Sequence, residues 1–277
     1  MKLSYPNGAN GASKWRLWKI TSLFLMTLFL FAGSLSATHY RYGTISWKRV
    51  PGASPGTCDI EVTVKQSWRR SFYGAPVVGG TVSTGTLSAA PMFGGPFGPS
   101  TGISLDVTSV NVVDDWFFGE WKDTITLPSD TAHYMLSYES CCRISSLINN
   151  ADDDFRSESV VTPCIKGNDS PVSTQIPIVK LPKGVADPNG DPLTYRLATP
   201  LEASGSIAGV VNATGFSITA GGMASFSTLG SSTGDLYNVF VAIEDTAGSK
   251  TMADFLIEVV DSSTPPEFDF AVTPSPS

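Results

Sequence analysis

Charged residues are scarce in this chain, and histidine is scarcer. Only 16% of the 277 residues are Asp, Glu, Lys or Arg, and just two are histidine. So low a charge excludes a chain kept unfolded by charge repulsion, and it argues against long solvated helices. Acidic residues outnumber basic ones, 25 to 18. This balance disfavours a nucleic acid partner, because phosphate binding needs clustered Lys and Arg, and it favours cations.

Catalytic motifs are missing as well. The sequence contains no H-E-x-x-H, no phosphate-binding glycine loop and no dinucleotide fingerprint. The segment 230–234 fits the pattern G-x-S-x-G, but the α/β-hydrolase order places a histidine after the serine, whereas His39 and His133 both precede it. We therefore expect no enzyme and no catalytic residue. The remaining alternative is an enzyme with a pair of carboxylates, which no pattern singles out.

Only one long hydrophobic run exists. The run Ile20–Gly33 follows Lys14, Arg16 and Lys19 and precedes a stretch of small residues. A basic flank, a short apolar core and small residues predict a signal peptide over 1–36, cleaved before Ala37, with cleavage after Ala37 as the alternative. The mature chain is then expected to be secreted, extracellular or at the cell surface. Membrane attachment is expected only if the signal stays uncleaved or the chain is truncated, because the run is shorter than a membrane span.

The four cysteines are Cys58, Cys141, Cys142 and Cys164. An even number in an oxidising compartment predicts two disulfides. We expect Cys58 and Cys164 each to pair with one member of the doublet, because a bridge between adjacent cysteines requires a strained eight-membered ring. A zinc site is disfavoured, since the usual C-x₂-C spacing is absent.

Hydrophobic residues alternate with polar ones through most of the mature chain, which predicts strands that cover a core on one face. The expected fold class is all-β, with two antiparallel β-sandwich domains in tandem over 37–167 and 170–262. The polar segment 167–171 separates them, and a Pro-rich linker or tail follows over 263–277. We expect the Gly-rich stretch 79–102 to be a surface loop. The apolar positions of the clearest alternations are Ile60, Val62 and Val64; Ile103, Leu105 and Val107; Tyr134, Leu136 and Tyr138; Tyr237, Val239, Val241 and Ile243; and Phe255, Ile257 and Val259.

Four segments of the second half resemble cadherin-like and related Ig-like repeats of the dystroglycan type. They are A-D-P-N-G-D-P-L-T-Y at 186–195, N-A-T-G-F-S-I at 212–218, V-A-I-E-D-T-A-G at 241–248 and I-E-V-V-D at 257–261. In the first half, 38–47 and 140–147 resemble an uncharacterised extracellular module that precedes such repeats. The resemblance implies a β-sandwich and a role in cell-surface or matrix interaction and adhesion.

The same resemblance implies a Ca²⁺ site near the ends of the domains. Calcium binds six to eight oxygen ligands from carboxylates and carbonyls, and extracellular modules bind it weakly. The alternative is that the aspartates only hydrogen-bond the amides of a turn. The positions that match the family's ligands are Asp187, Asn189, Asp191, Asn168, Asp169, Glu244 and Asp245.

The expected partner is an extracellular protein or glycan ligand, with no nucleic acid. A carbohydrate-binding module that uses aromatic residues of the first domain is the alternative function, because rings with a polar handle are favoured at interfaces. The other explanation of these rings is that they fill the core of the sandwich. The residues concerned are Trp47, Trp68, Trp116, Trp121, Tyr40, Tyr42, Tyr73 and Tyr134.

Overall fold

A computed structural model describes residues 39–173, 185–205 and 209–260. The chain divides into two compact units, Met1–Ser36 and Ala37–Ser277, and every described residue belongs to the second. The predicted signal peptide and the predicted tail over 263–277 lie outside the described residues. Within the described ranges, no helix is both long enough and apolar enough to cross a membrane.

The all-β prediction is confirmed, and every ladder between the described strands is antiparallel. All five predicted alternations coincide with strands, where their apolar positions are mostly buried, except that Val259 lies one residue beyond the last strand. The strands are β1 (Tyr40–Val50), β2 (Cys58–Arg69), β3 (Thr81–Pro91), β4 (Ser100–Asn111), β5 (Trp116–Leu127), β6 (Tyr134–Ser140), β7 (Phe155–Val161), β8 (Val172–Ser173), β9 (Val185–Ala186), β10 (Leu193–Leu197), β11 (Phe216–Ile218), β12 (Ala224–Phe226), β13 (Leu236–Asp245) and β14 (Lys250–Glu258).

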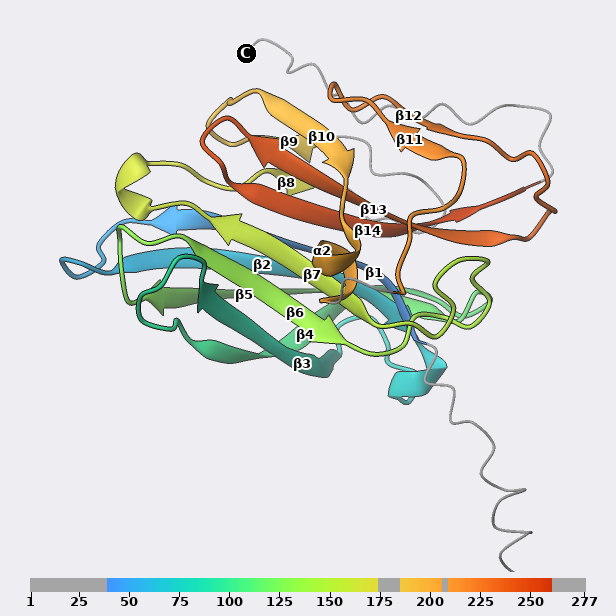
Figure 1. Ribbon diagram of the computed structural model, residues 1–277. Helices are drawn as coiled ribbons and strands as arrows, with labels where there is room; N and C mark the ends of the chain where they lie inside the picture. Colours follow the sequence, from blue (N-terminus) through green and yellow to red (C-terminus); the bar gives the residue numbers. More distant parts are fainter. Residues whose placement is uncertain (1–38, 174–184, 206–208, 261–277) are drawn as a thin grey trace, which may run out of the picture. The chain divides into compact units, whose positions relative to one another are not determined.

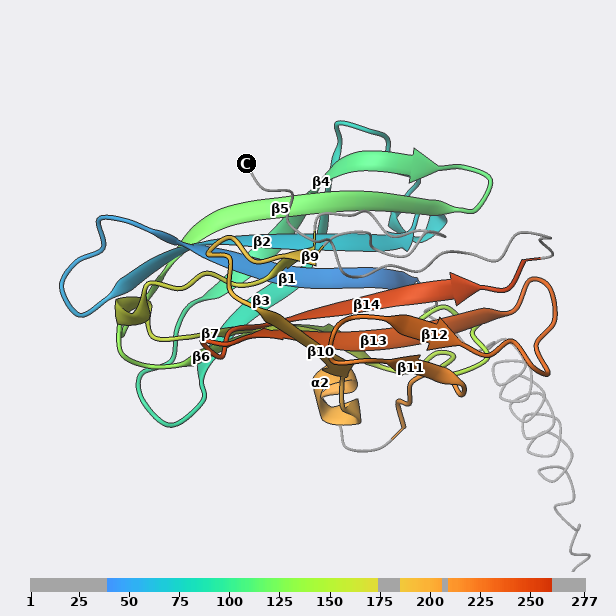
Figure 2. The same cartoon turned by 90° about the horizontal axis from the view of Figure 1, so that it is seen from above.

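Strand β14 joins the two halves of the chain. The main sheet has the order β1-β2-β5-β4-β3-β6-β7-β14-β13-β10, and an additional β1–β14 pairing closes a ring (Figure 1). Along one edge, β14 first pairs with β7 at Lys250↔Val160 and then with β1 at Gly43↔Asp254. Figure 2 shows β14 between β1 and β13. Strands from both sides of residues 167–170 therefore share hydrogen bonds, while the division into two domains there stays a prediction.

The apolar core has three parts that follow from this topology. The largest lies among β1 to β7 and includes Trp47, Trp68 and Phe155. The other two lie on opposite faces of β13, where Val241 belongs to one and Phe240 to the other. Strand β13 is thus buried on both faces, which explains its continuous run of apolar residues.

The expected surface loop over 79–102 was wrong, because the segment contains β3 and the start of β4. A register shift between Ser83 and Gly85 interrupts β3. Val82 is buried before this bulge, whereas Leu87 and Ala89 are buried after it, so the alternation changes phase within the strand. Gly85 has a φ of +144°, and a Cβ there would meet Tyr138 at 2.8 Å. Because the buried positions shift by one residue at Gly85, a search for uninterrupted alternation does not detect this strand.

One short helix, α2 (Pro200–Ser204), was not expected. Five residues are too few to show a helical period. A capping box begins the helix, since the Thr199 side chain accepts from the Glu202 amide and the Glu202 side chain accepts from the Thr199 amide. Gly205 ends it in the left-handed conformation. In Figure 1, α2 lies beside β7.

The disulfides pair differently from the expectation. The bridges are Cys58–Cys164 and Cys141–Cys142. The first joins the start of β2 to the turn after β7, where the Cα atoms lie 6.0 Å apart. The expectation that each doublet cysteine would pair with Cys58 or Cys164 was therefore wrong. That expectation assumed that adjacent cysteines do not bridge, because the ring is strained. The connection after β6 gives Cys142 a φ of +91°, a backbone conformation that a regular strand does not offer, and the adjacent cysteines are joined there.

Candidate functional site

The turn between β9 and β10 presents two aspartates from the sequence D-P-N-G-D. Asp187 Oδ1 accepts hydrogen bonds from the amides of Asn189, at 2.8 Å, and Asp191, at 3.0 Å. Gly190 has a φ of +80°, which a residue with a side chain rarely adopts, and its amide donates to Asp187 O. The chain therefore folds back on itself within five residues and brings Asp191 next to Asp187.

A third carboxylate reaches the same place from the hairpin between β13 and β14. Leu193 of β10 pairs with Asp245, the last residue of β13. This register sets Asp245 beside the turn that precedes β10. One carboxylate oxygen from each of Asp187, Asp191 and Asp245 lies within 4.8 Å of the others. We call these three residues the acidic triad.

The acidic triad has no cationic side chain to balance it among the described residues, since none of their ion pairs includes a triad member. Asp187 Oδ2 is buried and has no hydrogen-bond partner among the residues that the structure describes. Burial raises the pKa of Asp187, and the charges of Asp245 and Asp191 raise it further, while the two turn amides oppose the shift. These are the signs of a site where negative charge is concentrated without compensation.

Neighbouring polar groups hold the triad in place. Asn168 Nδ2 donates to Asp245 Oδ2 at 2.7 Å and to Ser249 Oγ at 2.8 Å. The Ser249 amide donates to the other oxygen of Asp245 at 2.9 Å. Asn168 is only 4% exposed and Ser249 is fully buried. Sequence reasoning missed Ser249, although its place four residues after Asp245 in a tight turn was a readable signal.

The other predicted ligands have different roles. Asn189 Oδ1 accepts from the Asp169 amide at 2.8 Å, and Asp169 Oδ1 accepts from the Arg49 amide at 2.8 Å. These bonds tie the segment after the first half to the turn and to β1. Glu244 lies apart from the triad, because it forms an ion pair with Arg196. The structure therefore brings together three of the seven predicted ligands, with Asn168 directly behind them.

The donor set of the triad fits Ca²⁺. Calcium prefers carboxylate oxygens over nitrogen or sulfur, and its large coordination shell leaves room for water and carbonyl ligands. Asp187 Oδ1 accepts the two turn amides, as expected if the aspartates only hydrogen-bond the turn. Asp187 Oδ2 is the oxygen left for a metal, so the two roles use different oxygens. The turn role does not account for the buried Oδ2, which has no hydrogen-bond partner within residues 39–173, 185–205 and 209–260.

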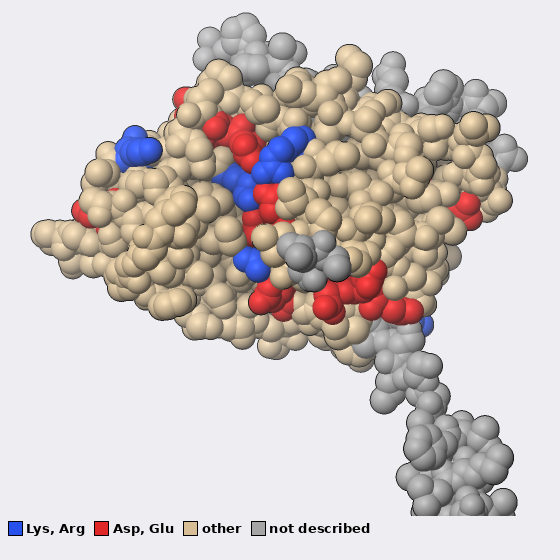
Figure 3. All heavy atoms as spheres, in the orientation of Figure 1, with Lys and Arg blue, Asp and Glu red and all other residues tan. Residues whose placement is uncertain are grey.

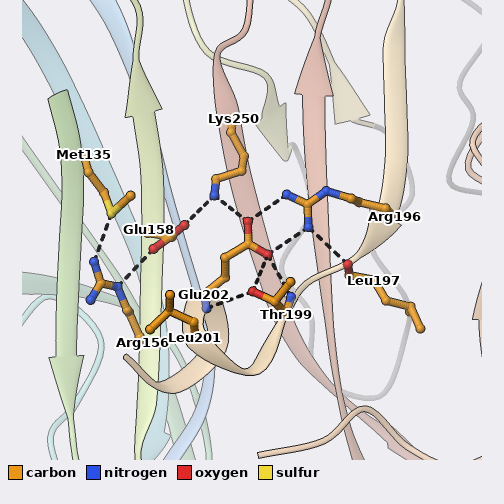
Figure 4. A pocket seen from close by; sticks show the side chains of 9 residues that line it. All are labelled: Met135, Arg156, Glu158, Arg196, Leu197, Thr199, Leu201, Glu202 and Lys250. Atoms are coloured by element: carbon orange, nitrogen blue, oxygen red, sulfur yellow. Dashed lines mark hydrogen bonds and ion pairs between the residues drawn. The ribbon is translucent and has the colours of Figure 1, made fainter. Parts of the chain in front are cut away.

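A second concave site, with a volume of about 600 Å³, lies beside α2. Figure 4 shows its charged side chains converging from β7, β10, α2 and β14. Lys250 Nζ pairs with Glu158, and with Glu202 Oε1 at 2.6 Å. Arg196 binds the Glu202 carboxylate through two nitrogens, at 2.7 and 2.8 Å. On the other side, Arg156 Nε lies 3.0 Å from Glu158 Oε2.

These charges satisfy one another. Burial alone would raise the pKa of Glu202, but hydrogen bonds from Arg196 and Lys250 hold that pKa well below its usual value. The hydrogen bonds that Arg196 donates to Glu202 raise the pKa of Arg196. Figure 3 shows acidic and basic side chains gathered in a band across this face, with wide uncharged surface beside it. The network acts as a junction between strands rather than as a set of free reactive groups.

The aromatic residues singled out for carbohydrate recognition mostly fill the core. Six of the eight are buried: Tyr40, Tyr42, Trp47, Trp68, Trp121 and Tyr134. Only Trp116 and Tyr73 are partly exposed. Tyr40 stacks on Phe155 with ring centroids 3.4 Å apart, inside the largest core cluster. The core explanation accounts for these rings.

Comparison with known proteins finds similarity to integrin beta-like proteins. Residues 41–164 match the family described as integrin beta-like protein A-E, N-terminal. The chain is 33% identical over 267 residues to integrin beta-like protein A of Dictyostelium discoideum, an alignment that covers 87% of this chain and 13% of that protein. It is 32% identical over 175 residues to integrin beta-like protein B of the same organism, covering 58% of this chain and 8% of that protein.

Integrin beta-like protein C of Dictyostelium discoideum is 35% identical over 175 residues, again with 58% of this chain and 8% of the relative covered. The chain thus spans between about a twelfth and an eighth of the length of these relatives. No solved structure matches the chain. The comparisons show no cadherin-like repeat, so that resemblance stays a prediction for residues 170–262.

Proposed function

We propose that this chain is an extracellular recognition module of the integrin beta-like type, which mediates adhesion to a cell surface or matrix and is stabilised by Ca²⁺ at the acidic triad. The observation that carries the adhesive role is the similarity to integrin beta-like protein A over 87% of the chain. Because the match covers 13% of that relative, the proposed role concerns only the matched part of such a protein and not its whole activity.

The calcium part of the proposal rests on the triad itself. Three carboxylates from two turns meet within 4.8 Å, and Asp187 Oδ2 is buried without a hydrogen-bond partner in the described part of the chain. A bound cation would neutralise their mutual repulsion. Asn168 and Asn189 connect the same place to the segment that leads back to β1. Holding the triad together would therefore also hold the first half of the chain against the second.

A non-enzymatic role is consistent with the arrangement of charges. The ionisable groups of the pocket beside α2 are paired with one another. The relatives are named as integrin beta-like proteins, which favours binding over catalysis. An extracellular location agrees with the signal predicted over 1–36 and with the two disulfides.

Adhesion can be tested with beads coated with the purified protein and suspended with Dictyostelium discoideum cells, the organism of the relatives. We expect cell binding in 1 mM Ca²⁺ that falls in EGTA. Beads coated with the Asp187→Asn variant should bind weakly in both conditions, whereas beads coated with Asp106→Asn, which alters an exposed acid on β4, should behave like the native protein.

Two results would contradict different parts of the proposal. Native beads that bind no better than albumin-coated beads would remove the adhesive role. Strong binding that is equal in Ca²⁺ and in EGTA would keep adhesion but remove its dependence on the triad.

A further inference from the structure

The two disulfides of this chain differ in how solvent reaches them. Cys58 is 3% exposed and Cys164 is 7% exposed, so both sulfurs of that bridge lie in the core. In the other bridge, Cys141 is exposed and Cys142 is half-buried. Thiol–disulfide exchange requires an attacking thiolate to reach a sulfur of the bridge. A thiolate in solution can therefore reach the Cys141–Cys142 bridge, whereas the Cys58–Cys164 bridge is shielded.

The two bridges also differ in what they constrain. Cys58 and Cys164 are 106 positions apart, so their bond removes much of the freedom of the unfolded chain. Cys141 and Cys142 are neighbours, and their bond closes no loop of intervening residues. Loop closure therefore gives this second bridge almost no role in global stability. Its effect must be on the local backbone.

That local backbone carries unusual contacts. Cys142 has a φ of +91°, which residues with a side chain seldom adopt. Its carbonyl accepts hydrogen bonds from the amides of His39, at 3.1 Å, and Tyr40, at 3.2 Å, where β1 begins. Its own amide donates to Asp153 O at 3.2 Å. The bridge thus holds the carbonyl that anchors the first strand.

The next residue extends this link into the core. Arg143 is 1% exposed and pairs with Asp254 on β14, the strand that joins both halves. Its Nε also donates to Asp154 O at 3.2 Å. The turn at Cys142 is what lets the chain pass from an exposed cysteine to a buried arginine within two residues. Opening of the Cys141–Cys142 bridge would therefore affect both the start of β1 and the contacts of Arg143.

We propose that the Cys141–Cys142 bridge is a thiol-exchange site, open to small extracellular thiols, whose reduction releases the start of β1. A thiolate attacks Cys141 Sγ, the bond between the two cysteine sulfurs breaks, and Cys142 Sγ leaves as a thiolate that takes a proton from water. A second thiolate attacks the small-thiol sulfur of the mixed disulfide, and Cys141 Sγ leaves as a thiolate that takes a proton from water, so the products are two cysteine thiols and the disulfide of the small thiol. The exchange is reversible, so an oxidised thiol pair restores the bridge.

The test treats the purified native protein with increasing concentrations of reduced glutathione or dithiothreitol, followed by iodoacetamide and peptide mass spectrometry. We expect the untreated protein to contain a peptide with Cys141 and Cys142 joined. Both residues should become alkylated at a roughly tenfold lower reductant concentration than Cys58 and Cys164, because only their bridge is accessible. Reduction of all four cysteines together, or of Cys58–Cys164 first, would overturn the exchange site.

Hydrogen exchange then tests the release of β1. Amides 39–41 and 142–143 should lose protection when only the Cys141–Cys142 bridge is reduced, and a Cys141→Ser/Cys142→Ser variant should show the same loss without reductant. Amides of β4, which lies away from this connection in the sheet order, serve as the internal control. Unchanged protection at 39–41 in both the reduced protein and the variant would overturn the release.

Discussion

Arg143 Nη1 lies 2.6 Å from Asp254 Oδ2, and each of these two side chains is only 1% exposed. Asn238 Nδ2 donates to the other oxygen of Asp254 at 2.5 Å, and Arg143 Nη2 donates to Ala203 O at 3.1 Å. One residue of the connection after β6 thus contacts β14 and α2 directly, and Asp254 links it to Asn238 of β13. Removal of either charge would leave the other buried without an opposite charge beside it.

We therefore predict that Arg143→Met destabilises the protein by about 3–5 kcal/mol, the range for breaking a buried pair on one side. Lys48→Met is the matched control, because Lys48 pairs with Glu61 at 3.1 Å but is 57% exposed, and its loss should cost about 0–1 kcal/mol. Urea unfolding followed by tryptophan fluorescence measures both. A cost below about 1 kcal/mol for Arg143→Met would show that the pair does not join the halves.

The pocket beside α2 predicts a dependence of stability on pH. The pKa of Glu202 is lowered from 4.5 in the folded state. A carboxyl with a depressed pKa contributes stability above its unfolded pKa and loses that contribution as the pH falls through the folded value. Glu202→Gln should thus cost about 1–3 kcal/mol near pH 7, and the difference from the native protein should shrink below about pH 4.5.

The control for this experiment is Glu258→Gln at the exposed end of β14, which forms no ion pair among the described residues. Its unfolding free energy should follow that of the native protein across the same pH range. A constant difference between native protein and Glu202→Gln from pH 7 to pH 3 would mean that the Arg196 and Lys250 contacts do not favour the charged form.

The disulfides predict unequal effects on stability. Cys58→Ala/Cys164→Ala should destabilise by about 2–5 kcal/mol, because the bridge closes a long loop. Cys141→Ser/Cys142→Ser should change the free energy of unfolding by less than about 1 kcal/mol. Denaturant titration of the two double variants compares them directly. Equal losses would contradict the separation of global and local roles.

The sequence predicted the strands best where one face alternates without interruption. Ile60, Val62 and Val64 are fully buried on β2, as the alternation requires. The prediction failed where the backbone itself breaks the period, as at the Gly85 bulge of β3, because a phase shift in a Gly-rich stretch looks like a loop. Helix α2 is too short for periodicity, and only the Thr199–Glu202 capping box marked it.

For the candidate site, the sequence named the turn aspartates and Asp245, and the register of β10 with β13 shows why they meet. Glu244 is adjacent to Asp245, but successive side chains of a strand point to opposite faces, and it pairs with Arg196 instead. The network of Glu158, Glu202 and Lys250 could not be predicted, because its members come from strands whose pairing depends on β14.

The acidic triad predicts that removal of one of its charges does not lower the melting temperature when calcium is absent. Asp187→Asn keeps an oxygen that can accept the two turn amides, and it removes one charge from a cluster without a cationic partner among the described residues. In EGTA at pH 7, the melting temperature of this variant should equal or exceed that of the native protein. Asp106→Asn should leave it unchanged. A clear drop for Asp187→Asn would mean that the carboxylates stabilise the apo protein.

Calorimetric titration of the purified protein with CaCl₂, paired with thermal unfolding, tests the central claim most directly. We predict binding with a Kd of about 10⁻⁴–10⁻³ M. At ten times that Kd the ion should add about 1.4 kcal/mol, or a rise in melting temperature of about 3–6 °C. Both effects should vanish in Asp187→Asn/Asp245→Asn and persist in Asp106→Asn. No calcium response in the native protein, or an equal response in the double variant, would contradict the account.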